Sequence, residues 1–169
     1  PTLSGFERTA GDEFQGVLND PPAVLAAIYR LLRDGRWNIG IGVDTVESPL
    51  GADPRAGRGA AFLAARTAVT TAKSSPWNLK VVGADHYACR QFETVLWLWA
   101  AALARRTAKG WELADLVQQG LNYEQAAQAI GITQSAVSQR AQAASLVEDR
   151  RARELIEQQA AQLLKGTTL

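Results

Sequence analysis

The chain has little of several features that would otherwise define its class. Among 169 residues it has one cysteine, Cys89, so an intramolecular disulfide is excluded and a cytoplasmic protein is the simplest expectation. His86 is its one histidine, and because two residues cannot complete a zinc site, we interpret the His86/Cys89 pair as packing. No signal peptide is visible. The apolar run ETVLWLWAAALARR is shorter than the ~20 residues of a membrane span, so we expect no membrane partner.

An excess of charge of one sign is also absent. The chain has 18 Lys/Arg and 17 Asp/Glu, a net charge of +1, whereas a protein that binds nucleic acid through its overall field is strongly basic. Any such affinity must come from locally placed side chains or from dimerisation. Hydrophobic residues make up 47%, enough for the cores of one full domain and one small one. The chain has no methionine and opens at Pro1 inside an expected strand, which predicts a missing N-terminal segment.

The first half predicts an α+β domain over residues 1–84. Two short runs around the turn at GDE indicate a β-hairpin, and Asp20 followed by two prolines begins a helix that Gly35 ends. The segments WNIGIGV and NLKVVG are typical of strands, and GAAFLAARTAVTTAK between them is helical. We expect an antiparallel sheet with helices on one face.

The second half is predicted to be entirely helical. A long connecting helix spans 85–109 and ends at Lys109-Gly110, and residues 110–169 form a domain of shorter helices with a break near Ser145. Two apolar groups fit either core packing or a homodimer contact, and the sequence leaves both open. They are Trp97 with Trp99, and the stripe Ile156, Ala160, Leu163 and Leu164.

Residues 121–142 have the spacing of two helices that cross at a tight turn. Asn122, with Gln125 three residues on, begins the first helix, Thr133 begins the second, and Gly131 supplies the left-handed turn between them. The inward positions are expected to be small or β-branched, and they are Ala127, Val137 and Ala141. This is the helix-turn-helix pattern.

The segment GITQSAVSQRA is similar to the second helix of Cro-type repressors and of sigma-factor region four. The resemblance implies a transcription regulator that binds double-stranded DNA as a homodimer. Its outward glutamine and serine side chains would meet base edges, and Arg140 and helix N-terminal amides would hold phosphates. The DNA-binding residues would be Thr133, Gln134, Ser135, Ser138, Gln139 and Arg140. An inert helical hairpin with solvated polar residues is the alternative.

The hairpin segment TAGDEFQ resembles the metal-binding hairpin of GGDEF and class III nucleotidyl cyclase domains. The resemblance implies that Asp12 and Glu13 hold Mg²⁺ against a nucleotide triphosphate. RGAAFLAAR is similar to the cyclase helix whose arginine faces the phosphates, which implies nucleotide contacts from Arg66 and from Arg58 just before it. In the alternative interpretation, the two carboxylates form only a polar turn.

Over most of its length the chain resembles the SatD family, through GDEFQGV, WNIGIGV, RGAAFLAAR and GITQSAVSQR in that order. The resemblance implies a ferredoxin-like, cyclase-like domain, truncated at its N-terminus, followed by a helix-turn-helix domain. Cyclases take a further metal carboxylate from a strand that would precede Thr2, and Phe62 stands where they place an asparagine. We therefore assign no catalytic residue.

The leading hypothesis is a DNA-binding regulator with no required cofactor, in which the α+β domain acts as a sensor or dimerises, with a nucleotide as candidate effector. The alternative is a nucleotide-binding or cyclase-like enzyme that uses Asp12, Glu13 and Mg²⁺.

Overall fold

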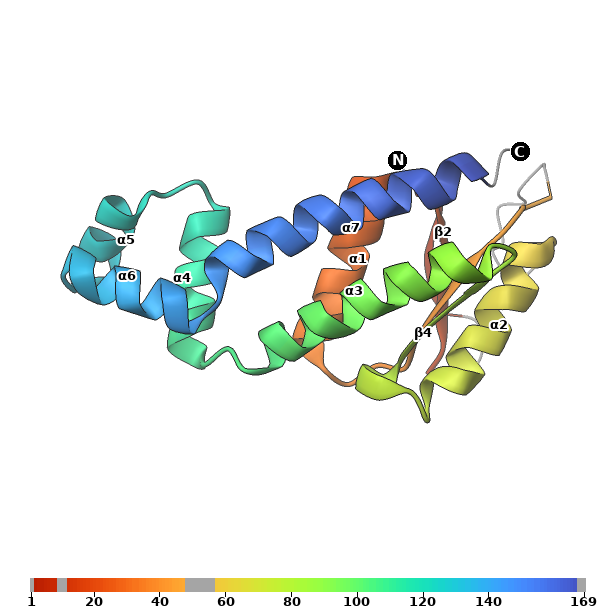
Figure 1. Cartoon of the computed structure of the whole chain (residues 1–169), viewed down its shortest axis with the longest axis horizontal. Coiled ribbons are helices and arrows are strands. Elements are labelled where there is room, and N and C mark those ends of the chain that lie inside the picture. The colour runs from red at the N-terminus through yellow and green to blue at the C-terminus, as the bar shows by residue number, and fades with distance from the viewer. Residues whose placement is uncertain (1, 9–11, 48–56, 167–169) are drawn as a thin grey trace. The chain divides into compact units, whose positions relative to one another are not determined.

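The structure, a computed structural model, describes residues 2–8, 12–47 and 57–166 and has a mixed α+β composition (Figure 1). Its elements, in order, are β1 (Thr2–Arg8), β2 (Phe14–Leu18), α1 (Pro21–Asp34), β3 (Ile39–Val43), α2 (Ala60–Ala72), the 3₁₀ helix η2 (Pro76–Asn78), β4 (Leu79–Gly83), α3 (His86–Ala104), α4 (Ala108–Gln118), α5 (Tyr123–Ile130), α6 (Gln134–Ala143) and α7 (Leu146–Gly166). Within the described ranges, none of these helices combines the length and apolar character of a bilayer span.

The chain divides into two compact units. The strand unit comprises Pro1–Trp97 with Glu154–Leu169, and the helical unit comprises Leu98–Arg153. The division therefore falls inside α3, within the segment where we expected a connecting helix, and the end of α7 belongs to the strand unit.

The first elements of the strand unit are those that the sequence predicts. β1 and β2 pair antiparallel as a hairpin. The Asp20 side chain accepts a hydrogen bond from the Ala23 amide at 3.1 Å and so begins α1, and Gly35 ends this helix in the left-handed region at φ 70°. Both predicted ends of the helix are confirmed.

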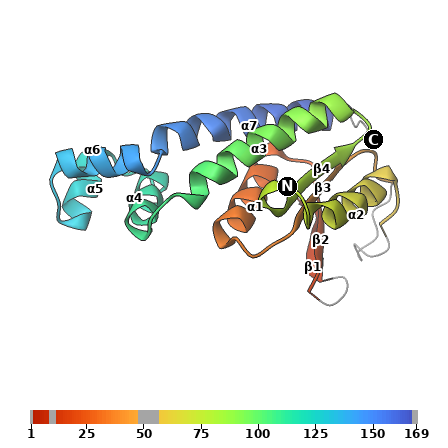
Figure 2. The same ribbon diagram turned by 60° about the horizontal axis from the view of Figure 1, so that its bottom comes forward.

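The pairing of β3 with β4 corrects one expectation. We expected an antiparallel sheet throughout, but these two strands are parallel, with Ile39 opposite Leu79, and form a sheet separate from β1–β2. The reason is the connection, because α2 lies between the two strands in sequence and packs on both of them (Figure 2). A Cβ atom on Gly40 would lie 2.3 Å from the backbone nitrogen of Val69, so glycine permits this close packing.

The outer edge of β4 is covered by side chains of α3. The buried Glu93 carboxylate accepts hydrogen bonds from the Val81 amide at 2.8 Å and from the Lys80 ammonium at 2.9 Å. The indole of Trp97 donates to the Leu79 carbonyl at 3.0 Å. Two side chains thus take the place that a further strand would occupy along β4.

The junction between α3 and α4 also differs from expectation. The connecting helix was expected to continue to Lys109, but α3 ends at Ala104, and α4 begins at Ala108 with Thr107 as its cap. The Thr107 hydroxyl accepts a hydrogen bond from the Gly110 amide at 3.2 Å, so this glycine lies within the first turn of α4 instead of ending a helix. The expected break near Ser145 is confirmed, because Ser145 has φ 53° between α6 and α7.

The two apolar groups that were open to two interpretations contribute to the core. Trp99 is 2% exposed, and Trp97 is partly buried. Ile156 and Ala160 on α7 are buried, and the other two members of the stripe, Leu163 and Leu164, are partly buried. Trp99, Ile156 and Ala160 are therefore core residues, while a homodimer contact through the partly buried Trp97, Leu163 and Leu164 stays a prediction.

Candidate functional site

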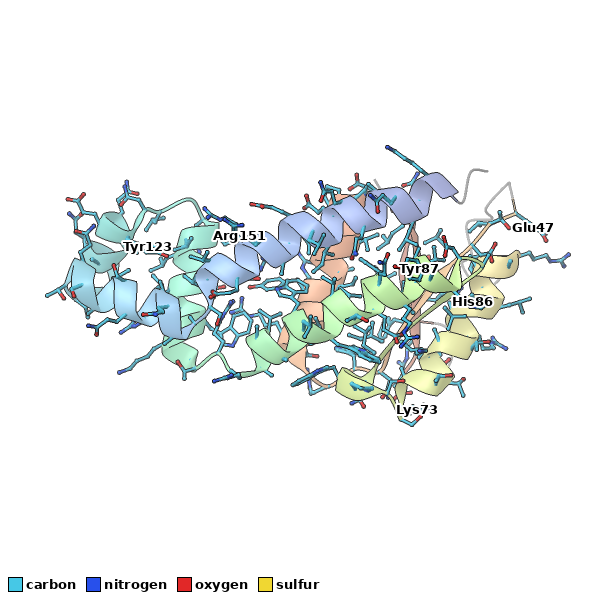
Figure 3. All side chains as sticks on the ribbon, viewed as in Figure 1. Glu47, Lys73, His86, Tyr87, Tyr123 and Arg151 are labelled. Carbon is cyan, nitrogen blue, oxygen red and sulfur yellow. The ribbon has the colours of Figure 1, made fainter. Side chains whose placement is uncertain are left out.

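The candidate site lies in the helical unit, where α4, α5 and α6 pack against one another (Figure 1). A reciprocal pair of hydrogen bonds fixes the start of α5. The Asn122 side chain accepts from the Gln125 amide, and the Gln125 side chain accepts from the Asn122 amide, each at 2.9 Å. This capping box is the one that the sequence predicts. Tyr123 follows in the first turn and is labelled in Figure 3.

A three-residue turn joins α5 to α6. Gly131 has φ 75° and ψ 36°, and its amide donates to the Ala127 carbonyl at 2.9 Å. The Ile132 amide donates to the same carbonyl at 3.1 Å. Thr133 then accepts a hydrogen bond from the Ala136 amide at 3.2 Å and caps α6. The turn is therefore held at both ends, which fixes the angle at which α6 leaves it.

Small side chains allow the three helices to approach closely. The buried cluster comprises Leu113, Ala114, Ala126, Ala127, Val137, Ala141, Ala144 and Leu146. The predicted inward positions of the two-helix segment are therefore confirmed. Because five of these eight residues are alanine, the backbones of α4, α5 and α6 pack closely together. One face of α6 is therefore buried in the core.

The opposite face of α6 is exposed and consists of uncharged polar residues. Thr133, Gln134, Ser135, Ser138 and Gln139 are all exposed. The Ser138 hydroxyl donates to the Gln134 carbonyl at 3.1 Å, one turn earlier on the same helix. Five of the six predicted DNA-binding residues thus lie together on the solvent side of one helix and its cap.

The sixth residue, Arg140, is held differently. Its side chain is 18% exposed, and Nη1 donates to Oε2 of Glu112 on α4 at 3.2 Å. The Glu112 side chain is 54% exposed. In this arrangement the arginine that we expected to hold phosphate already has a carboxylate partner, which the sequence did not predict.

The C-terminal end of α6 is anchored by a buried cluster that we did not predict either. The Arg106 guanidinium donates from Nε to the Ala144 carbonyl at 3.0 Å and from Nη2 to Asp149 at 3.2 Å. Trp99 Nε1 and Arg153 Nε donate to the same carboxylate, at 2.7 and 3.1 Å. One buried carboxylate therefore joins the end of α3, the turn before α4 and the first turn of α7.

One aromatic ring lies against each of the two arginines of this cluster. The Arg106 guanidinium carbon lies 4.6 Å from the centre of the Trp111 ring, and that of Arg153 lies 5.4 Å from the Trp99 ring. Attraction between each cation and its ring adds to the hydrogen bonds and keeps the arginines oriented.

The candidate nucleotide and metal residues of the strand unit are exposed. Asp12 and Glu13 precede β2, while Gly11 of the predicted turn is outside the described residues. Arg66 is on α2, and the Arg58 carbonyl accepts from the Glu47 amide at 2.9 Å. Over the described ranges, no group of three or more His, Cys, Asp or Glu side chains is arranged to hold a metal ion.

The His86/Cys89 pair is split between solvent and core. His86 and its neighbour Tyr87, both labelled in Figure 3, are exposed at the start of α3. Cys89 is 3% exposed. Burial raises the pKa of the Cys89 thiol, and the carboxylates of Asp85 and Glu93 raise it further, because each disfavours a thiolate.

Comparison with known proteins found no matching protein family, no similar curated protein and no similar solved structure.

Proposed function

We propose that the chain binds duplex DNA through α5, the turn at Gly131 and α6, which act as a helix-turn-helix, and that it regulates transcription. One observation carries this proposal: α6 buries Val137 and Ala141 against its neighbours and exposes a continuous polar face from Thr133 to Gln139. A helix with that division can enter the major groove while its inner side holds it to the protein.

The chemistry of the exposed face is suited to base edges. The glutamine amides of Gln134 and Gln139 can each donate and accept toward adenine, and the hydroxyls of Ser135 and Ser138 can serve donors or acceptors. The amides at the start of α6 carry the positive end of the helix dipole, which favours a phosphate there. The exposed face of α6 has no lysine or arginine at its centre. This supports contact with base edges more than nonspecific attraction to the DNA phosphate backbone.

The balance of charge in the helical unit favours a dimer on the DNA. Leu98–Arg153 holds seven Lys/Arg and five Asp/Glu. Asp149 forms ion pairs with two of those arginines, and Glu112 forms one with a third. One copy would therefore bind weakly, so we propose a homodimer that contacts two half-sites, as is usual for this motif.

We further propose that the strand unit is a cyclase-like domain of the SatD family that senses an effector or dimerises. The mixed α+β composition and the order of hairpin, helix, strand, helix and strand support this assignment. A nucleotide is the proposed effector, through Arg58 and Arg66 with Mg²⁺ at Asp12 and Glu13. Thermal unfolding with Mg²⁺ and each nucleoside triphosphate tests it, because a bound nucleotide raises the midpoint. An unchanged midpoint with all four would contradict it.

Fluorescence anisotropy with pooled genomic duplexes, at low and moderate salt, tests the DNA-binding proposal. The double variant Gln134→Ala/Ser138→Ala removes two base-reading side chains and should weaken specific binding about tenfold or more, since each good base contact contributes about 1–3 kcal/mol. Gln118→Ala/Gln119→Ala is the matched control, because both residues are exposed at the far end of α4. If the wild type fails to bind, or if the double variant binds as tightly as the control, the proposal is wrong.

A further inference from the structure

The ion pair between Arg140 and Glu112 bears on how the proposed DNA interface is controlled. Arg140 is the only lysine or arginine between residues 121 and 147, and Glu124 is the only acidic residue there. The electrostatic attraction of α5 and α6 for a phosphate backbone therefore depends largely on one guanidinium. In the structure that guanidinium donates to the Glu112 carboxylate at 3.2 Å.

The geometry of the pair makes it exchangeable. It has a single hydrogen bond, from Nη1 to Oε2, instead of the two parallel bonds of a bidentate pair. Glu112 is 54% exposed, so water and salt reach the carboxylate and weaken its hold. A DNA phosphate offers the same guanidinium an anionic oxygen of equal hydrogen-bonding power.

We propose that Glu112 is an intramolecular competitor for Arg140. In the free protein the carboxylate holds the guanidinium against α4, and on DNA a backbone phosphate replaces it. Glu112 thereby lowers affinity for every duplex, correct or not, and leaves recognition to the uncharged face of α6. The inference rests on the proposed DNA binding and deepens it, because it assigns the phosphate contact and the residue that opposes it.

The test compares Glu112→Gln, Arg140→Gln and the double variant by anisotropy on one duplex over a series of salt concentrations. At low salt Glu112→Gln should bind about two- to fivefold more tightly than wild type, the range expected from losing one exposed ion pair. This gain should shrink as the salt concentration rises, because salt already weakens the ion pair in the wild type. Arg140→Gln should bind more weakly, and its log–log salt slope should fall by about 0.9, the value for one lost phosphate contact. In the Arg140→Gln background, adding Glu112→Gln should tighten DNA binding no more than the control substitution Glu124→Gln does.

Glu124→Gln is the matched control, because it removes an exposed carboxylate from the same three helices without touching Arg140. It measures how much any lost negative charge tightens binding. The inference is overturned if Glu112→Gln does no more than Glu124→Gln, or if its effect persists without Arg140. It is also overturned if Arg140→Gln weakens binding with an unchanged salt slope, which would mean that the arginine stays on α4. Wild-type protein that binds no duplex would instead overturn the proposed function itself.

Discussion

Asp149→Ala removes the carboxylate shared by three donors in the helical unit and should strongly destabilise the protein. The Arg106 side chain is 0% exposed, and Asp149 is its only anionic partner among the described residues. Arg106 would keep its bond to the Ala144 carbonyl, but Nη1 already has no hydrogen-bond partner, so no spare interaction replaces the lost one. Breaking a buried pair from one side costs about 3–5 kcal/mol, a large fraction of a typical total stability.

Urea denaturation followed by tryptophan fluorescence measures this loss as a lower midpoint. The matched control is Glu148→Ala, since Glu148 is the exposed neighbour in the same first turn of α7 and its removal costs only the helix-dipole contribution, about 0.3–1 kcal/mol. Arg106→Met/Asp149→Leu should lose less than Asp149→Ala, because neither charge is then left unpaired. An Asp149→Ala variant within about 1 kcal/mol of Glu148→Ala would refute the reasoning.

Three further substitutions or reactions test the packing. Gly131→Ala should cost about 1–2 kcal/mol in thermal or urea unfolding, because its φ of 75° disfavours a side chain, whereas Gly166→Ala in α7 should cost nothing; equal midpoints would contradict this. Gly40→Ala should cost at least about 1–3 kcal/mol, because its Cβ would lie 2.3 Å from a backbone nitrogen of α2 and force the helix off the sheet; a wild-type midpoint would refute that contact. Cys89 should react with a thiol reagent at pH 8 only as fast as the protein unfolds, since burial raises its pKa; immediate labelling of native protein would contradict its position.

The sequence predicted the elements whose signals are local. Asp20, Asn122 and Thr133 each cap a helix within three residues of themselves, and Gly35 and Gly131 each adopt the left-handed conformation that ends one. Such signals depend on one side chain and the nearest amides, so a linear pattern contains them fully. The exposed and buried sides of α6 follow from the same local information, through its helical period.

Contacts between residues far apart in the sequence could not be predicted from local patterns. Trp99 and Asp149 are separated by 50 residues, and Glu112 and Arg140 by 28, and neither pair has a spacing that predicts contact. The direction of β4 beside β3 was missed for a different reason, because the predicted order of strand, helix and strand already favours a parallel pair over the antiparallel one that we expected. The two side-chain pairs form only when the helices pack, after local structure is set.

The covering of β4 by α3 has a consequence for solvent access along β3. The Leu79 carbonyl and the Val81 amide point to α3, so the backbone of Lys80 between them points to β3. By the same alternation the amides of Gly40 and Gly42 point away from β4, to the side of β3 where no strand pairs with it among the described residues. Deuterium uptake along this strand should therefore alternate, slow at Ile41 and faster at the two glycines that flank it. Gly40 and Gly42 pack closely against α2, yet their amides should be among those in this sheet that exchange fastest with deuterium.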